Sequence, residues 1–204
     1  MRGLVLAIIL VAVTSLRAGD EPYWEPYQFK GTEHFKYEIV QQDNEGKQEG
    51  WYIIDIKKAG EKYKLHIEGK LGDNEGSMTT TVESVDDISG AILAQMFLNP
   101  WLAPLSITLF SNMWATAYAP MLITSGWEVG SKWSHKDEEG NKITVEIPSE
   151  CKYAGQKGRK ILVKKNGKNI YESCVAHGVA LPIYVKFIGD KGELYEMKLV
   201  EYKN

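Results

Sequence analysis

The chain has 204 residues, of which 44% are hydrophobic, enough for one domain with a sizeable core. Its 24 Lys and Arg residues nearly balance 27 Asp and Glu residues, for a net charge of −3. Because binding to phosphate backbones needs a basic surface, this balance argues against nucleic acid as a partner.

The N-terminus has the three regions of a secretory signal peptide. Arg2 precedes the apolar run Leu4–Val13, and the small residues Thr14, Ser15 and Ala18 follow, although Leu16 and Arg17 make the cleavage site imperfect. The apolar run is too short to span a bilayer as a helix. We therefore expect a cleaved signal peptide at residues 1–18, a single half-barrel domain at residues 19–204, and a periplasmic or secreted protein. Retention of the segment as an anchor stays open.

Strand patterns begin after the N-terminal region. In Phe35–Ile39 and in Tyr63–Ile67, apolar side chains alternate with polar or charged ones, as in strands with one covered face. Trp51–Ile56 is nearly continuously apolar, and Met78–Val85 is rich in Thr and Val. Since only short polar turns separate these segments, they predict an antiparallel meander without crossover helices.

A long stretch without charge follows. Ile88–Trp127 contains no Asp, Glu, Lys or Arg. Two aspartates precede it, where an N-cap and a first-turn acid belong, which predicts a helix over Ile88–Leu98. The Asn-Pro pair at 99–100 repeats the start signal and predicts a second helix between Trp101 and Ala119. Prolines divide the stretch into pieces too short to span a membrane, so we expect a helical insertion at about residues 86–122.

Strand patterns then resume. They cover Trp127–Trp133, Ile143–Ile147, Ile161–Lys165, Ile170–Val175, Leu181–Ile188 and Leu194–Tyr202. The pair Asn166-Gly167 is a strong hairpin signal. The whole pattern predicts a mainly β fold with a helical insertion (α+β). We expect a curved antiparallel sheet, or half-open β-barrel, covered on one face by two helices.

The chain has two cysteines, Cys151 and Cys174. In an oxidising compartment a disulfide between them is the default expectation. Two buried thiols are the alternative, and a redox pair would need the CxxC spacing that is missing here.

Residues with catalytic patterns are scarce. The four histidines are not spaced as metal ligands, and no nucleophilic serine motif, phosphate loop or cysteine–histidine signature is present. The acidic runs at 86–87 and 137–139 are typical of helix caps and solvated turns. The sequence therefore predicts no catalytic residue, no metal, no cofactor and no enzymatic activity.

Three short motifs carry a resemblance to a known class. They are Val129-Gly130-x-x-Trp133, Leu181-Pro182-x-x-Val185 and Leu199-Val200-Glu201-Tyr202. In these the chain resembles bacterial periplasmic half-barrel proteins of the lipoprotein carrier and receptor type, and related uncharacterised exported domains. The resemblance covers roughly Trp127 to the C-terminus by motif and the earlier half by architecture. It implies an apolar cavity for acyl chains between the concave sheet face and the helices. The cysteine pair and the length of the uncharged stretch depart from the carriers, so lipoprotein is not carried over as the ligand.

These patterns predict an exported, non-enzymatic binding protein that sequesters an acyl chain, lipid or other apolar ligand between the sheet and lid helices. Each buried methylene contributes about 0.8 kcal/mol, so a long acyl chain can bind without specific polar contacts. The alternative is an envelope structural or protein-interaction module with a filled core, and peripheral contact with the membrane or an envelope protein stays open. The candidate ligand-binding residues are Phe35, Tyr37, Ile39, Tyr63, Leu65, Ile67, Leu98, Trp101, Leu105, Leu109, Met113, Tyr195, Met197 and Leu199.

Overall fold

The computed structural model describes residues 29–44, 46–102, 128–189 and 191–204. These residues form eleven strands, one α-helix and one 3-10 helix. The strands are β1 (His34–Asp43), β2 (Gly46–Ala59), β3 (Lys62–Leu71), β4 (Asn74–Val82), β5 (Lys132–Lys136), β6 (Lys142–Glu146), β7 (Glu150–Tyr153), β8 (Gln156–Lys165), β9 (Lys168–Ala176), β10 (Tyr184–Ile188) and β11 (Leu194–Lys203). The helices are α2 (Asp87–Leu98) and η1 (Pro100–Leu102).

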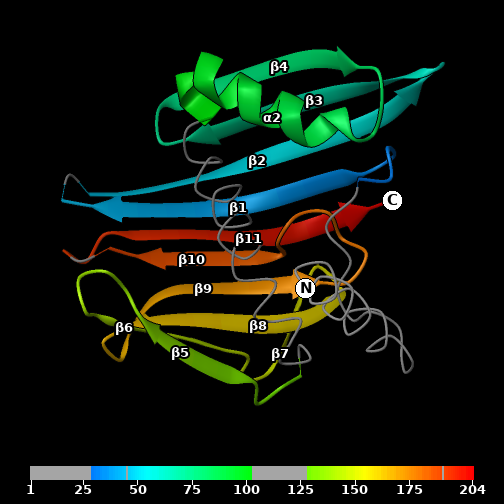
Figure 1. The fold of residues 1–204 in the computed structure, drawn as a ribbon. Helices are drawn as coiled ribbons and strands as arrows, with labels where there is room; N and C mark the ends of the chain where they lie inside the picture. Colours follow the sequence, from blue (N-terminus) through cyan, green and yellow to red (C-terminus); the bar gives the residue numbers. More distant parts are fainter. Residues whose placement is uncertain (1–28, 45, 103–127, 190) are drawn as a thin grey trace, which may run out of the picture.

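All strands belong to one antiparallel sheet (Figure 1), whose order is β4-β3-β2-β1-β11-β10-β9-β8-β6-β5, with β7 paired to β8 off this path. The predicted meander of the first four strands is confirmed. The first and last strands of the chain, β1 and β11, pair along almost their whole length in the middle of the sheet. This pairing joins the meander β1–β4 to the strands β5–β11 on the other side of the sheet. Nothing in the local sequence patterns had indicated it.

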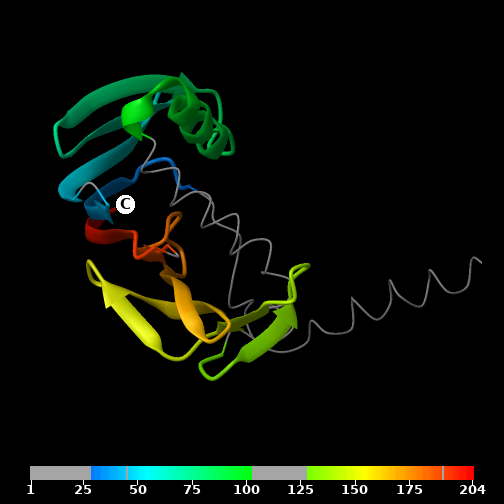
Figure 2. The ribbon, with the colours of Figure 1, turned by 90° about the vertical axis from the view of Figure 1, so that its left-hand side faces the viewer.

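The sheet is strongly curved, and Figure 2 shows α2 lying on its concave side. We call this concave side the inner face. The mainly β, open and curved architecture is therefore as predicted. The cover of two helices is not confirmed, because one α-helix is present in the described residues. The second helix was predicted between Trp101 and Ala119. Of this range the structure describes only Trp101 and Leu102, which belong to the 3-10 helix η1, and the rest lies outside the described residues.

Several predicted boundaries were wrong. The strand expected at Trp127–Trp133 starts at Lys132, because Gly130 has φ +99° and Ser131 N–H donates to the Glu128 carbonyl in a turn. The strand β7 was missed, since four residues are too short for a clear alternation. The Asn166-Gly167 hairpin is confirmed, with both residues at positive φ, 51° and 84°.

Buried apolar residues form two clusters. The larger one lies mainly on the inner face of β1–β4 and β11, with Ile88, Ile92 and Leu102 packed over it from α2 and η1. It also takes in the segment 179–183 and part of the opposite face around Cys174. The smaller cluster joins β6, β8, β9 and β10, with Trp133 of β5 at its side. Both ends of the sheet thus have their own apolar core.

Candidate functional site

The predicted inner-face residues on the strands share one face of the sheet. Tyr37 is opposite both Tyr52 and Leu199, and paired residues point to the same side. The buried members, each no more than 4% exposed, are Phe35, Tyr37, Ile39, Leu65, Ile67, Tyr195, Met197 and Leu199. Tyr63 is half-buried. The alternation of apolar and polar residues therefore predicted correctly which side chains of these strands point to the inner face.

The predicted lid residues have different outcomes. Trp101 is half-buried and packs against the larger cluster. Leu98 was expected on the inner face, but it is 72% exposed. It is the last residue of α2, before the extended backbone of Asn99, and its side chain is not packed against the sheet. Leu105, Leu109 and Met113 lie outside the described residues.

Next to α2, the protein's own side chains fill the inner face. The Tyr52 hydroxyl donates a hydrogen bond of 2.5 Å to the Trp101 carbonyl, and the two rings stack with centroids 6.1 Å apart. Burial raises the pKa of Tyr52 to about 12. The rings lie over Gly69 and Gly76, where an added Cβ would overlap Tyr52 and Trp101 respectively. The glycines thus provide the space in which η1 is seated.

The loop between β9 and β10 covers another part of the inner face. The Tyr37 hydroxyl donates a hydrogen bond of 3.1 Å to the Pro182 carbonyl. Leu181 and Ile183 in the same loop are buried. The Leu181-Pro182 motif therefore belongs to a covering loop, and β10 starts later than predicted, at Tyr184.

At the other end of the strands one aromatic residue of the inner face is exposed. A cross-strand row runs from Gln41 through Tyr195 and Phe187 to Tyr171. Phe187 is 43% exposed and contacts Tyr171 edge-on, with ring centroids 6.1 Å apart. The Phe187 ring of the inner face is therefore accessible here, while Tyr195 and Tyr171 are buried.

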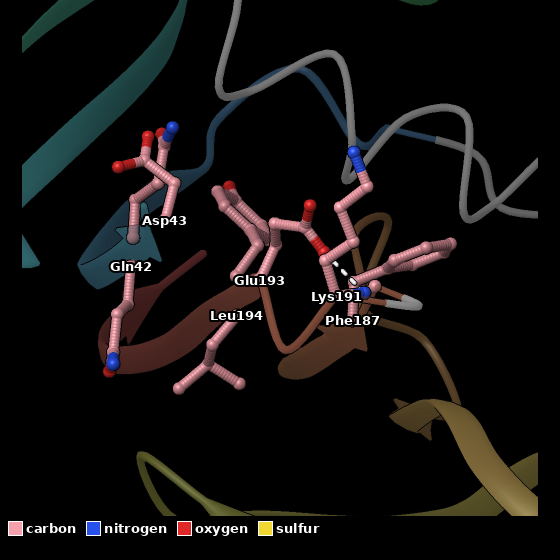
Figure 3. Close-up of a pocket in the computed structure, with 9 residues that line it drawn as sticks. Gln42, Asp43, Phe187, Lys191, Glu193 and Leu194 are labelled. Carbon is pink, nitrogen blue, oxygen red and sulfur yellow. Dashed lines mark hydrogen bonds between the residues drawn. The ribbon is translucent and has the colours of Figure 1, made fainter. Parts of the chain in front are cut away.

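A cavity of about 490 Å³, the rim cavity, lies at this point. It is open to solvent and is formed where β1 ends and the β10–β11 hairpin turns (Figure 3). Its lining residues are Gln41, Gln42, Asp43, Phe187, Gly189, Lys191, Glu193, Leu194 and Tyr195. Only Tyr195 had been predicted as a ligand-binding residue. The others sit in strand ends and turns, where periodicity gives no signal of a cavity.

Charged groups of the rim cavity have distinct roles. The Glu193 carboxylate accepts a hydrogen bond of 3.0 Å from the Lys191 backbone N–H and so shapes the turn. Asp43 accepts one of 3.2 Å from the Gly46 N–H in the β1–β2 turn. Within the described residues, no carboxylate forms an ion pair with the Lys191 ammonium. In Figure 3 the Lys191 side chain extends to the same side of the hairpin as the Glu193 carboxylate.

The predicted disulfide is present. Cys151 of β7 is bonded to Cys174 of β9, with Cα atoms 6.1 Å apart. Cys174 pairs with Tyr184, which lies on the face opposite to that of Val185. The rings of Tyr184 and Tyr153 stack beside the bond, with centroids 4.8 Å apart. The disulfide therefore links β7 to β9 on the outer, convex side of the sheet.

In the described residues, no three His, Cys, Asp or Glu side chains come together as metal ligands. His34 instead pairs with Asp55 at 3.0 Å, and His66 with Thr79 at 2.8 Å. The same part of the chain contains no helix with the length and apolar character needed to cross a membrane.

Comparison with known proteins gives likeness at the level of fold. No family model and no curated protein matches the chain. Among solved structures it is similar to MucB, at 8% identity and a TM-score of 0.42, over 85% of this chain and 53% of MucB. The chain thus spans about half the length of that protein.

Two further structures have similar coverage. One is an exported protein with a YmcC-like fold from Bacteroides fragilis, at 10% identity and a TM-score of 0.31, over 88% of this chain and 100% of that one. The other is an outer membrane lipoprotein-sorting protein domain from Vibrio parahaemolyticus, at 8% identity and a TM-score of 0.26, over 86% of each chain. The class that the sequence motifs resemble is thus represented among these structures, and the likeness concerns the fold alone.

Proposed function

We propose that this is an exported, non-enzymatic binding protein that holds an acyl chain or another apolar ligand at the rim cavity. The observation that supports the proposal is Phe187, an aromatic residue of the inner face that stays 43% exposed beside a cavity of about 490 Å³. Ligand pockets usually measure roughly 300–1,000 Å³ and combine apolar walls with a few polar groups. The rim cavity has both properties.

The driving force would be burial of apolar surface. A ligand chain laid against Phe187 and Tyr195 would remove both its own methylenes and the phenylalanine ring from water. Each methylene contributes about 0.8 kcal/mol, so several together give useful affinity without catalysis or a metal. The proposal assigns the inner face next to α2 a structural role, because Tyr52 and Trp101 already fill it.

Export rests on the N-terminal pattern of a basic residue, an apolar run and small residues. N-terminal sequencing of the protein purified from its own host tests this. A mature chain that begins near Gly19 supports the proposal, and one that retains Met1 contradicts cleavage.

Ligand binding can be tested on the same material. Native mass spectrometry and organic extraction should reveal a co-purified apolar species, and the delipidated protein should take up a fluorescent fatty acid. Phe187→Ala should weaken uptake about fivefold to tenfold, since most of one aromatic contact is lost. Val129→Ala is the matched control, because Val129 is similarly exposed, at 47%, and does not line the cavity.

The alternative function is an envelope structural or protein-interaction module. One observation favours it, namely that hydrogen bonds from Tyr37 and Tyr52 fix parts of the chain itself onto the inner face. If the protein carries no apolar species and takes up no fatty acid, the binding proposal fails and this alternative is preferred.

A further inference from the structure

We propose that the rim cavity selects amphiphiles by a zwitterionic head group that offers both an anionic group and N–H donors. The inference rests on the proposed function and names the class of ligand that the same site takes. It follows from which charged and polar groups line this cavity.

The polar wall contains charges of both signs. Lys191 contributes an ammonium, while Asp43 and Glu193 contribute carboxylates. Gln41 and Gln42 add amides, which can donate and accept. A fatty acid head would pair with the ammonium but would offer no N–H donor to the two carboxylates. A cationic head would pair with the carboxylates and leave the ammonium without a partner.

A zwitterion satisfies both sides at once. Its anionic group can accept from Lys191, which has no ion-pair partner in the described residues, and its N–H donors can bind the carboxylates. The carboxylates are held in place for this, because each accepts a hydrogen bond from a backbone N–H of its own turn. A head with the positive charge but no N–H, such as a quaternary amine, would lose these donor contacts.

The apolar wall gives the acyl chain its place. Phe187 and Tyr195 line the same cavity as the charged groups and belong to the cross-strand row of the inner face. The head of an amphiphile can therefore reach the hairpin turns while its chain lies on the aromatic rings. The same cavity would therefore bind the head group and bury the acyl chain.

Isothermal titration calorimetry with four probes of equal acyl chain, each below its critical micelle concentration, tests the inference. The probes are lysophosphatidylethanolamine, lysophosphatidylcholine, a fatty acid and a monoacylglycerol. We expect the full-length mature protein to bind lysophosphatidylethanolamine roughly threefold to tenfold more tightly than the other three, as suits a few solvent-exposed charge contacts.

Variants identify the groups responsible. Lys191→Met and the double variant Asp43→Asn, Glu193→Gln should each reduce this preference about threefold. The asparagine and glutamine keep an acceptor oxygen for the turn hydrogen bonds. Lys168→Met is the control, since Lys168 is also an exposed lysine but lies at the start of β9 and does not line the cavity.

The outcomes separate the two proposals. Equal affinity for all four probes, or a preference that survives both sets of variants, overturns the zwitterion proposal and leaves acyl-chain binding in place. Tighter binding of the fatty acid than of lysophosphatidylethanolamine overturns it too. If no probe binds, both proposals fail.

Discussion

The two ends of the sheet are stabilised in different ways. At the β1–β4 end, α2 and η1 lie on the inner face, and aromatic rings fill the space over two glycines. At the β5–β9 end the buried apolar cluster is smaller, and a disulfide on the outer face links β7 to β9. The rim cavity lies between them, at β1, β10 and β11. Neither the helices nor the disulfide lines the rim cavity, where the Phe187 ring is exposed.

Removing the disulfide should have the largest effect. The two cysteines are 23 positions apart in the sequence, so the cross-link is worth about 3 kcal/mol of unfolding free energy. The double variant Cys151→Ser, Cys174→Ser should lose about this amount in urea denaturation, and hydrogen exchange should accelerate mainly in β7–β9. Equal acceleration in β2–β4 would contradict the division into two separately stabilised ends. The wild type in reductant should behave like the variant.

The second largest loss of stability should come from adding a side chain where Trp101 of η1 packs on the sheet. A methyl group at Gly76 would overlap the Trp101 ring, and such overpacking typically costs about 1–3 kcal/mol. Gly76→Ala should therefore lower the urea midpoint. Gly90→Ala is the matched control, because a Cβ there meets no other atom and helix propensity predicts a gain of up to about 1 kcal/mol. A Gly76→Ala variant as stable as the wild type would show that η1 is not tightly seated.

Removing one hydroxyl should have a smaller effect. Tyr52→Phe keeps the ring over Gly69 but loses the hydrogen bond to the Trp101 carbonyl, a loss of about 1 kcal/mol. The fluorescence of Trp101 reports on its position. However, the chain has six tryptophans, so the stability measurement itself is the deciding one. No change in unfolding free energy would mean that the carbonyl finds another donor.

The pH dependence of stability should show the smallest effect, which arises from Glu33, the residue just before β1. Glu33 is 1% exposed, and burial raises its pKa above the usual 4.5, although its carboxylate accepts hydrogen bonds from the Lys30 and Gly31 N–H groups. The folded state therefore holds this proton more strongly than the unfolded state does. Its stabilising contribution is complete below pH 4.5 and is lost as the pH rises through the raised value.

Urea midpoints measured across this pH range test the expectation. Glu33→Gln should flatten the decline, because the amide does not titrate. The other carboxylates remain in the variant, so the difference between the two curves isolates Glu33. Parallel curves would contradict a raised pKa at this position.

Much of the fold could be predicted from local patterns. The alternation around Tyr37 and Leu65 identified strands and their buried face, because side chains of a strand point to opposite sides in turn. Asn166-Gly167 identified a hairpin because both residues tolerate positive φ. Boundaries were less certain, as Lys132 shows, since a glycine turn decides where a strand begins.

The candidate site was predicted only in part. Tyr195 was named because it alternates with Met197 and Leu199, whereas Phe187 and Lys191 were not named. The cavity forms where the end of β1 lies beside the β10–β11 hairpin. The residue pattern of a single strand does not show how the ends of different strands lie in space. The prediction that Leu98 lies on the inner face was wrong, since an apolar residue at a helix end is not always buried.

Sequence by itself determined most of the strands, their buried face, the main turns and the cysteine pair, because these depend on backbone preferences and on residues close together in the chain. The tertiary structure decided the rest. It paired β1 with β11, placed Trp101 on Gly76 and left Phe187 exposed beside Lys191. These contacts join residues that are far apart in the sequence, so only the packing of the whole sheet brings them together.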